Sequence, residues 1–193
     1  MVWRVNLYNI IYADPPWKQT KGGLRKIRPN QKRELDYQTI SLDEIKDILK
    51  SFRDKSEENH IMFCWTIDKY LFESEQMLKD LGYKIHARMI WDKTNGVAPA
   101  FTVRYSHEYL LYCYHGKFIS ISKEMRGKYT TVLREQATKH SKKPEIAYKM
   151  IEDLYPNTNK IELFARNKRE GWTSWGNEVD KFEENKQLSL LSI

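Results

Sequence analysis

The stretch VNLYNIIYADPPW, residues 5–17, begins like a strand and ends in a sequence that strands tolerate badly. Its first nine residues are rich in β-branched and aromatic side chains, which predicts a buried strand that ends at Asp14. Pro15 and Pro16 follow at once, and each removes a backbone donor and fixes φ. The stretch therefore predicts a stiff turn that presents the Asp14 carboxylate and the indole of Trp17.

Beyond this turn, strand-like segments alternate with amphipathic helical segments. Strands are expected at 60–65, 84–93, 107–117 and 160–166, and helices at 41–52, 66–81 and 142–156. A Ser41–Glu44 capping box, a C-cap at Gly82 and Pro144 in a first turn support the helix boundaries. No Gly-x-Gly-x-x-Gly motif, internal repeat or domain linker is present in the sequence. The pattern predicts a single α/β domain with an open sheet, whose ligands bind outside the carboxyl ends of the strands.

The net charge of +7 is concentrated in one segment. Residues 18–33 hold seven Lys or Arg and no acid, so this segment accounts for the whole excess. Such a segment is either a solvated loop or an arm that grips nucleic-acid phosphates. The candidate phosphate contacts are Lys18, Lys21, Arg25, Lys26 and Arg28, together with Lys93 and Arg104 farther along the chain.

Several classes of protein are disfavoured by the composition. Cys64 and Cys113 lie in apolar strand-like runs, which argues against a disulfide framework. The five histidines lack the spacing of metal ligands, so no metal site is expected. The first residues lack the features of a signal peptide, and no apolar run is long enough for a membrane span. We therefore expect an intracellular protein that is neither secreted nor bound to a membrane.

The DPPW turn suits chemistry on an unreactive amine. The exocyclic amine of adenine is a poor nucleophile, because its lone pair is delocalised into the ring. A carboxylate and a backbone carbonyl that accept its two N–H groups can hold the lone pair toward an electrophile, and a rigid turn preserves that geometry. Trp17 could add a stacking face worth about 1–3 kcal/mol per base. The same four residues could equally form an ordinary turn with a partly buried tryptophan.

A series of motifs resembles the DPPW-type N6-adenine methyltransferases, the MT-A-70-like family, in its small bacterial and phage form. After ADPPW come YQTIS (37–41), FCWT (63–66), MIWDKTN (89–95), HEYLL (107–111), HSKKPEIAYKMIE (140–152), KIELFAR (160–166) and WGNE (175–178). The resemblance covers residues 8–178 and keeps the order and approximate spacing of the family. Ala165 stands where the family usually has Gly, and Glu178 stands where Gln is frequent.

The resemblance implies a Rossmann-like sheet with S-adenosylmethionine as methyl donor and S-adenosylhomocysteine as product. The catalytic motif precedes the donor-binding segments, a permuted order. Residues 1–180 would form the methyltransferase domain, with a basic loop at 18–33 and a substrate loop at 93–106, and residues 181–193 would form a tail. Asp14 would engage both the target amine and the amino end of the donor. Pro15 and Pro16 would shape the turn, and Trp17 would pack against the flipped adenine.

The remaining site residues also follow from the resemblance. Lys143 would meet the donor carboxylate, while Glu162, Phe164 and Arg166 would lie beneath the donor ribose. Asn177 and Glu178 would bond ribose hydroxyls or the purine. His107, beside Glu108, is interpreted as a support of the substrate loop, because the amine formed after transfer is acidic enough to need no dedicated base.

The sequence thus predicts direct methyl transfer to adenine N6 in a base that is flipped out or single-stranded. DNA is favoured over RNA, because no RNA-binding module accompanies the domain. The alternatives are an RNA adenosine methyltransferase, a non-catalytic partner subunit, or an enzyme that methylates another amine. The tail residues Gln187–Leu191 resemble sliding-clamp peptides, although they could instead pack on the protein itself or on a partner. The expected location is the cytoplasm of a bacterial or phage-infected cell, and the oligomeric state is left open.

Overall fold

The computed structural model describes residues 7–18, 40–95, 103, 105–138 and 142–176. Within these ranges a single sheet contains seven strands. They are β1 (Tyr8–Ala13), β2 (Ser56–Thr66), β3 (Lys84–Asp92), β4 (His107–His115), β5 (Val132–Arg134), β6 (Lys160–Leu163) and β7 (Trp172–Trp175). The helices are α1 (Leu42–Arg53), α2 (Leu71–Asp80) and α3 (Glu145–Leu154), with short 3-10 turns η1 (Asp68–Tyr70) and η2 (Lys123–Met125).

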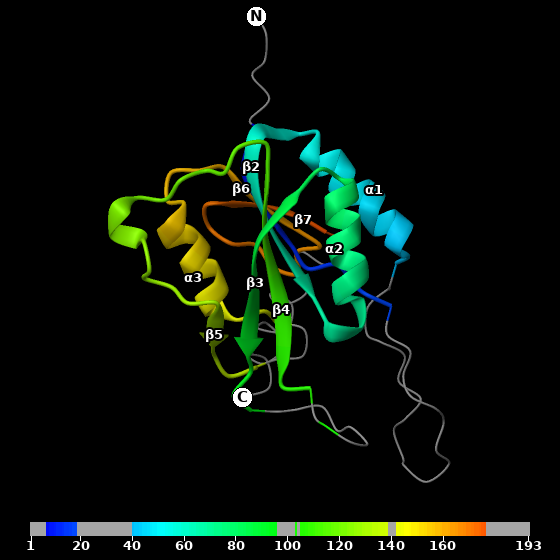
Figure 1. Cartoon of the computed structure of the whole chain (residues 1–193), viewed down its shortest axis with the longest axis vertical. Coiled ribbons are helices and arrows are strands. Elements are labelled where there is room, and N and C mark those ends of the chain that lie inside the picture. Colours follow the sequence, from blue (N-terminus) through cyan, green and yellow to red (C-terminus); the bar gives the residue numbers. More distant parts are fainter. Residues whose placement is uncertain (1–6, 19–39, 96–102, 104, 139–141, 177–193) are drawn as a thin grey trace, which may run out of the picture.

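The strand order β5-β3-β4-β2-β1-β6-β7 places β1 between β2 and β6 (Figure 1). β4 is antiparallel to both of its neighbours, and all other neighbouring strands are parallel. The carboxyl ends of six strands and the start of β4 therefore lie at one edge of the sheet. The DPPW turn leaves β1 at this edge, where open α/β sheets bind their ligands.

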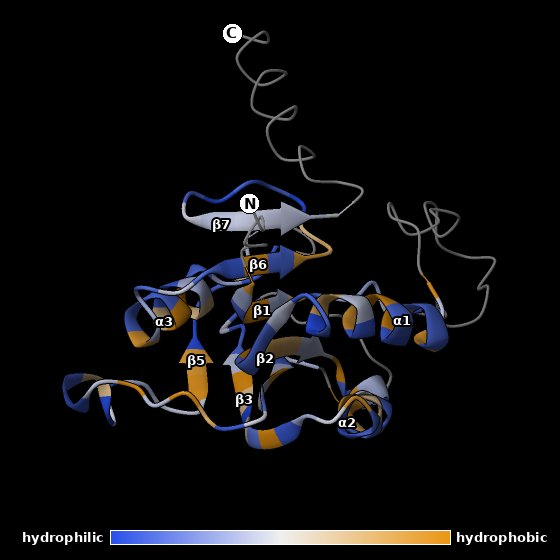
Figure 2. Cartoon of the chain, turned by 90° about the horizontal axis from the view of Figure 1, so that it is seen from above, coloured by the Kyte–Doolittle hydropathy of each residue, from blue (hydrophilic) through white to orange (hydrophobic). Residues whose placement is uncertain are grey.

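Helices cover both faces of the sheet, with α3 on one side and α1 and α2 on the other (Figure 2). Successive β1 side chains alternate between the two cores: Ile10 and Tyr12 pack on the α3 side, while Ile11 and Ala13 pack on the side of α1 and α2. The same alternation points Asp14 toward the α3 side. Among the described residues, no helix combines the length and apolar character needed to cross a bilayer.

The predicted α/β architecture is confirmed, and the Ser41–Glu44 capping box is present at the start of α1. Cys64 and Cys113 are both buried and free, as expected. The helix expected from residue 66 begins only at Leu71, after η1, because Thr66 still pairs with β4. The strand expected at 160–166 ends at Leu163, since the next residue adopts a positive φ of 62°. The short strands β5 and β7 were not predicted.

Candidate active site

The turn after β1 is closed by backbone hydrogen bonds. The amide of Asp14 donates to the carbonyl of Leu163 over 3.4 Å, which ties the end of β1 to the end of β6. The amide of Trp17 donates to the carbonyl of Pro15 over 2.9 Å. Because a carbonyl has two lone pairs, the Pro15 oxygen keeps capacity for a further donor. These two hydrogen bonds add to the restraint that Pro15 and Pro16 place on the turn.

Trp17 lies inside the protein and does not face a ligand. Its side chain is 5% exposed, its Nε1–H donates to the carbonyl of Trp65 over 3.1 Å, and its ring stacks on Tyr70 at 5.3 Å between centroids. The expectation that Trp17 presents an open face to the flipped adenine is therefore wrong for this structure. The indole instead braces the turn from the side of α1 and α2, because η1 carries Tyr70 against it.

Four charged side chains of alternating sign form a chain of ion pairs beside the turn. The Nζ of Lys143 lies 2.9 Å from Oδ1 of Asp14 and 2.7 Å from Oε2 of Glu108, and the Nζ of Lys93 lies 2.7 Å from Oε1 of Glu108. All four side chains are at most 21% exposed. The Lys143 ammonium also lies 5.3 Å above the ring of Trp65. We call Asp14, Lys143, Glu108 and Lys93 the ion-pair chain.

Burial and pairing compete in setting the charges of this chain. Burial raises the pKa of Asp14 above its usual value, although the nearby charges of Lys143 and Arg166 oppose the rise. Burial also acts to raise the pKa of Glu108, but Lys143 and Lys93 outweigh it and lower that pKa to about 2. For Lys143, burial favours deprotonation, yet the two carboxylates prevail and hold its pKa above the usual range. At neutral pH, Glu108 and Lys143 are therefore charged.

Glu162 is a second buried carboxyl on the same face of the sheet. It pairs in register with Tyr12, it is 5% exposed, and its Oε1 accepts the hydroxyl of Tyr148 over 2.8 Å. Burial raises its pKa to about 7. Among the described residues, its Oε2 has no hydrogen-bond partner, and neither do the buried Tyr12 hydroxyl and Trp65 Nε1. Three neighbouring strands thus bring unpaired polar atoms to the α3 side, where a ligand or water must satisfy them.

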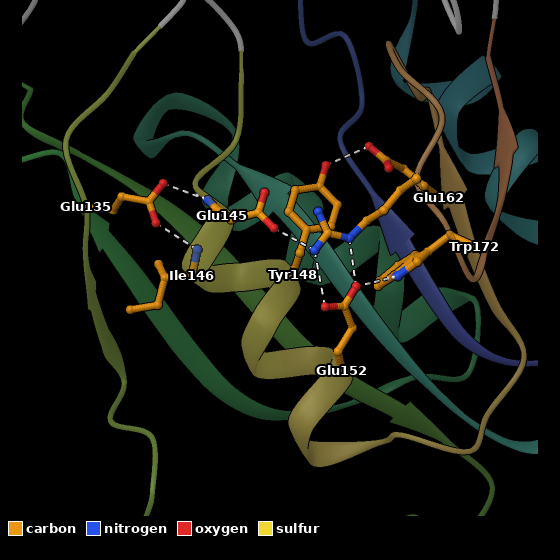
Figure 3. A network of polar contacts seen from close by, with 8 residues as sticks. Glu135, Glu145, Ile146, Tyr148, Glu152, Glu162 and Trp172 are labelled. Carbon is orange, nitrogen blue, oxygen red and sulfur yellow. Dashed lines mark hydrogen bonds and ion pairs between the residues drawn. The ribbon is translucent and has the colours of Figure 1, made fainter.

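The loop after β6 is fastened to α3 (Figure 3). Arg169 donates from Nε to Glu152 over 2.7 Å and from Nη2 to Glu145 over 2.6 Å, and its guanidinium lies 4.6 Å above the ring of Tyr148. The indole of Trp172 donates to Glu152 over 2.9 Å. These contacts fix residues 164–171 relative to α3, and Lys143 lies just before the start of that helix.

The backbone at the end of β6 makes an unusually close approach to the end of β7. Phe164 has a φ of 62°, and the amide of Ala165 donates to the carbonyl of Trp175 over 3.0 Å. A Cβ added at Gly176 would lie 2.6 Å from the Ala165 oxygen, so only glycine fits there. Ala165 itself has no positive φ, which explains why alanine is tolerated where the family usually has glycine.

Other predicted site residues have mixed outcomes. Lys93 is paired with Glu108, and its role as a phosphate contact stays a prediction. His107 is half-buried with its ring against Tyr109 at 4.9 Å, Arg166 is half-buried, and Lys18 is exposed. Lys21, Arg25, Lys26, Arg28, Arg104, Asn177, Glu178 and the tail segment 187–191 lie outside the described residues. No group of three or more side chains suited to a metal occurs in the described part.

Sequence reasoning did not single out Tyr12, Tyr148 or Arg169. Only Tyr12 carried a signal, because it lies two residues before Asp14 and so shares a face of β1 with it. The double pairing of Glu108 could not be read from the sequence, since its partner Lys143 lies 35 residues away.

The open parallel sheet, the single antiparallel strand and the polar cluster at the carboxyl edge are consistent with a Rossmann-like methyltransferase fold. Residues 8–178 match the family model described as MT-A70, and the chain belongs to that family.

Named relatives have similar sequences over most of this chain. The putative N(6)-adenosine-methyltransferase MT-A70-like of Medicago truncatula is 29% identical over 178 residues, which cover 89% of this chain and 26% of the relative. The type II methyltransferase M.MunI of Mycoplasma sp is 27% identical over 186 residues, which cover 89% of this chain and 78% of the relative. Human METTL4, an N(6)-adenine-specific methyltransferase, is 27% identical over 194 residues, which cover 91% of this chain and 38% of the relative. The chain spans about a quarter of the plant relative and most of M.MunI.

Proposed function

We propose that this chain transfers a methyl group from S-adenosylmethionine to the N6 amine of adenine in DNA. The target base would be flipped out of the duplex or already single-stranded. The observation that carries the proposal is the position of Asp14, on a proline-stiffened turn at the ligand-binding edge and 2.9 Å from the ammonium of Lys143. The names of the relatives support methylation at N6. The similarity to the type II methyltransferase M.MunI supports DNA as the substrate.

The residues of the site fit the proposed donor. A methionine end carries one ammonium and one carboxylate, and Asp14 and Lys143 offer the two opposite charges side by side. Glu162 adds a buried carboxylate oxygen without a partner among the described residues, which suits a hydroxyl donor such as a ribose. The donor would supply an electrophilic methyl group on a positively charged sulfur.

The residues of the chain would act by positioning. The Asp14 carboxylate would accept an N–H of the target amine and so direct the lone pair of the amine toward the methyl carbon. The stiff turn would keep the carboxylate in the position that this requires. Lys143 favours the ionised form of Asp14 against the effect of burial, since its charge acts to lower the Asp14 pKa that burial raises. Trp17 contributes from inside the protein by holding the turn through Trp65 and Tyr70. The amine that forms is acidic and loses its proton without a dedicated base.

The test is incubation of the pure chain with methyl-labelled donor and with separate DNA and RNA pools, followed by nucleoside analysis. We expect label in N6-methyladenine from DNA. Asp14→Asn should lower the rate by about 100-fold or more, because the amide no longer accepts in the same way. Asp80→Asn is the matched control, since Asp80 is an exposed residue of α2 that pairs with Lys46 of α1, on the face of the sheet away from Lys143. Label in RNA alone would select the RNA alternative, and no label in either pool would contradict the proposal.

A further inference from the structure

The connection between β4 and β5 is long and is held in place. It runs from residue 116 to 131, with only η2 as regular structure. Connections of more than about 12–15 residues with little secondary structure are uncommon, and the ordered ones are usually functional. Half-buried side chains anchor this one to the core on the α3 side: Phe118, Ile119, Ile121, Met125 and Tyr129. The hydroxyl of Tyr129 also bonds the carboxylate of Asp153, in the last turn of α3.

The outward side chains of this connection are cationic or carry hydroxyl groups. Ser120, Ser122, Lys123, Arg126, Lys128, Thr130 and Thr131 are all exposed, against one exposed acid, Glu124, and the exposed Arg134 ends the adjoining strand β5. Among the described residues, Lys123 and Arg126 have no ion pair, and Lys128 is half exposed with its nearest acid, Asp153, 3.8 Å away. Arg134 is 68% exposed and lies 3.5 Å from Asp92. Lysine, arginine, serine and threonine are the residues that contact nucleic-acid phosphates. We call Lys123, Arg126, Lys128 and Arg134 the basic ridge.

The basic ridge leads to the active-site edge of the sheet. Arg134 ends β5 beside Asp92 at the carboxyl end of β3, which is the edge that carries Asp14. Lys128 lies beside Asp153 at the carboxyl end of α3, which is the end away from Lys143 and the active-site edge. The connection passes along α3 in Figure 1. The ten residues of α3 span about 15 Å at 1.5 Å per residue. Since one DNA strand advances about 3.4 Å per nucleotide, the ridge matches about four or five base pairs.

The charge of the ridge is not a general property of the surface. The helices α1 and α2 on the other face carry six acids and four basic residues. Residues 116–131 carry four Lys or Arg against one acid, whereas the neighbouring α3 carries three acids against one lysine. The positive charge is therefore local to the connection and to Arg134 at the active-site edge, and such clusters of positive charge attract polyphosphates.

We propose that the basic ridge binds the phosphate backbone of duplex DNA on one side of the target adenine. The inference rests on the proposed function, which brings DNA to the carboxyl edge of the sheet. The contact is independent of sequence and concerns phosphates alone, so it supplies affinity and orientation rather than recognition of a particular site.

The test measures binding of the full chain to a duplex of about 20 base pairs at several salt concentrations. The variant Lys123→Ala/Arg126→Ala/Lys128→Ala should bind more weakly, and its slope of log affinity against log salt should fall by about 0.9 per lost contact, or about 2.7 in all. The control Lys50→Ala/Lys55→Ala/Lys79→Ala removes the same charge from the other face and should keep the wild-type slope. Shortening the duplex to fewer than about four base pairs on one side of the target adenine should remove the difference in salt slope between the variant and wild type. Shortening it on the other side of the adenine should leave that difference unchanged.

A second measurement separates this inference from the proposed function. Methylation of a short single-stranded oligonucleotide, too short to reach the ridge, should proceed at the wild-type kcat in the triple variant. An unchanged salt slope in the triple variant overturns the ridge, whether or not adenine is methylated. Absence of methylation by the wild type overturns the proposed function, whereas a reduced slope would still support the ridge.

Discussion

Replacing Glu162 by glutamine separates the charge of this carboxyl group from its shape. Glu162 is 5% exposed, accepts one hydrogen bond from Tyr148, and has an Oε2 with no partner among the described residues. Burial therefore raises its pKa from 4.5 to about 7. Glutamine keeps an oxygen for the Tyr148 hydroxyl and cannot ionise. We expect Glu162→Gln to stabilise the fold, and the gain to depend on pH.

The sign and size follow from the two pKa values. Between pH 4.5 and about 7 the folded protein keeps the Glu162 proton while the unfolded chain loses it, so stability falls as pH rises. The difference between the folded and unfolded pKa values of Glu162, at about 1.4 kcal/mol per pH unit, corresponds to about 3 kcal/mol of stability. The stability that the protonated Glu162 contributes is fully present below pH 4.5 and is lost as pH rises through about 7. At pH 8, Glu162→Gln should therefore be more stable than wild type by up to about 3 kcal/mol, and the gain should be small at pH 5.

The assay is urea denaturation of both proteins at pH 5, 6, 7 and 8. Glu152→Gln is the matched control, because Arg169 and Trp172 bond the Glu152 carboxylate and lower its pKa. That variant should be less stable than wild type by a nearly constant amount from pH 5 to 8, because the stabilising contribution of the ionised Glu152 is already present above pH 4.5. A constant difference between Glu162→Gln and wild type from pH 5 to 8 would refute the reasoning. If Glu162 bonds the donor as proposed, the stabilised variant should also show a higher KM for the donor.

Three further changes test the packing around the site. His60 is buried, and burial lowers its pKa from 6.5 to about 4, so its own contribution to stability should fall by about 3 kcal/mol as pH drops through this range, opposite in sign to that of Glu162. In urea denaturation, His60→Gln should therefore gain about 3 kcal/mol relative to wild type over the same range. Trp17→Phe should cost about 1–3 kcal/mol of stability, because the buried Trp65 carbonyl loses the hydrogen bond from the indole; an unchanged unfolding midpoint would show that this hydrogen bond does not stabilise the fold. Gly176→Ala should weaken S-adenosylhomocysteine binding in calorimetry, since its Cβ would collide with Ala165.

The sequence predicts best where a local pattern has one structural outcome. The strand-forming residues and the two prolines around Asp14 predicted the end of β1 to within one residue, since β1 ends at Ala13. The capping box predicted the start of α1. β5 and β7 have three and four residues, which is too short for a periodicity to show. The orientation of Trp17 depended on Tyr70, which lies in a segment expected to be continuous helix. Local sequence does not encode such a contact between distant residues.

The candidate site follows the same division. Asp14, Lys143 and Glu162 were predicted from motifs that resemble a family, and the fold brings Asp14 and Lys143 into contact across 129 positions of sequence. That Lys143 also pairs with Glu108 could not be predicted, because the pairing depends on β4 being antiparallel beside β2. Motifs thus selected the candidate residues, and the sheet order determined which charged side chains surround them.

The ion-pair chain determines how Lys143 must be tested. Removing Lys143 alone leaves Asp14 and Glu108 without the cation between them, which raises the Asp14 pKa whatever Lys143 does to the donor. Loss of activity in Lys143→Met therefore cannot by itself assign a donor contact. The double variant Lys143→Met/Glu108→Gln also removes the negative neighbour that raises the Asp14 pKa.

In Lys143→Met we expect the acidic limb of the kcat/KM profile to move to higher pH, and in the double variant to move back toward wild type. Donor binding should stay weak in both variants, because the donor carboxylate would have lost its cation in each. Calorimetry with S-adenosylhomocysteine measures that affinity separately from the pH profile. Recovery of donor affinity in the double variant would show that Lys143 acts only through Asp14. Weak binding together with a restored profile would assign Lys143 both tasks, keeping Asp14 ionised and binding the donor carboxylate.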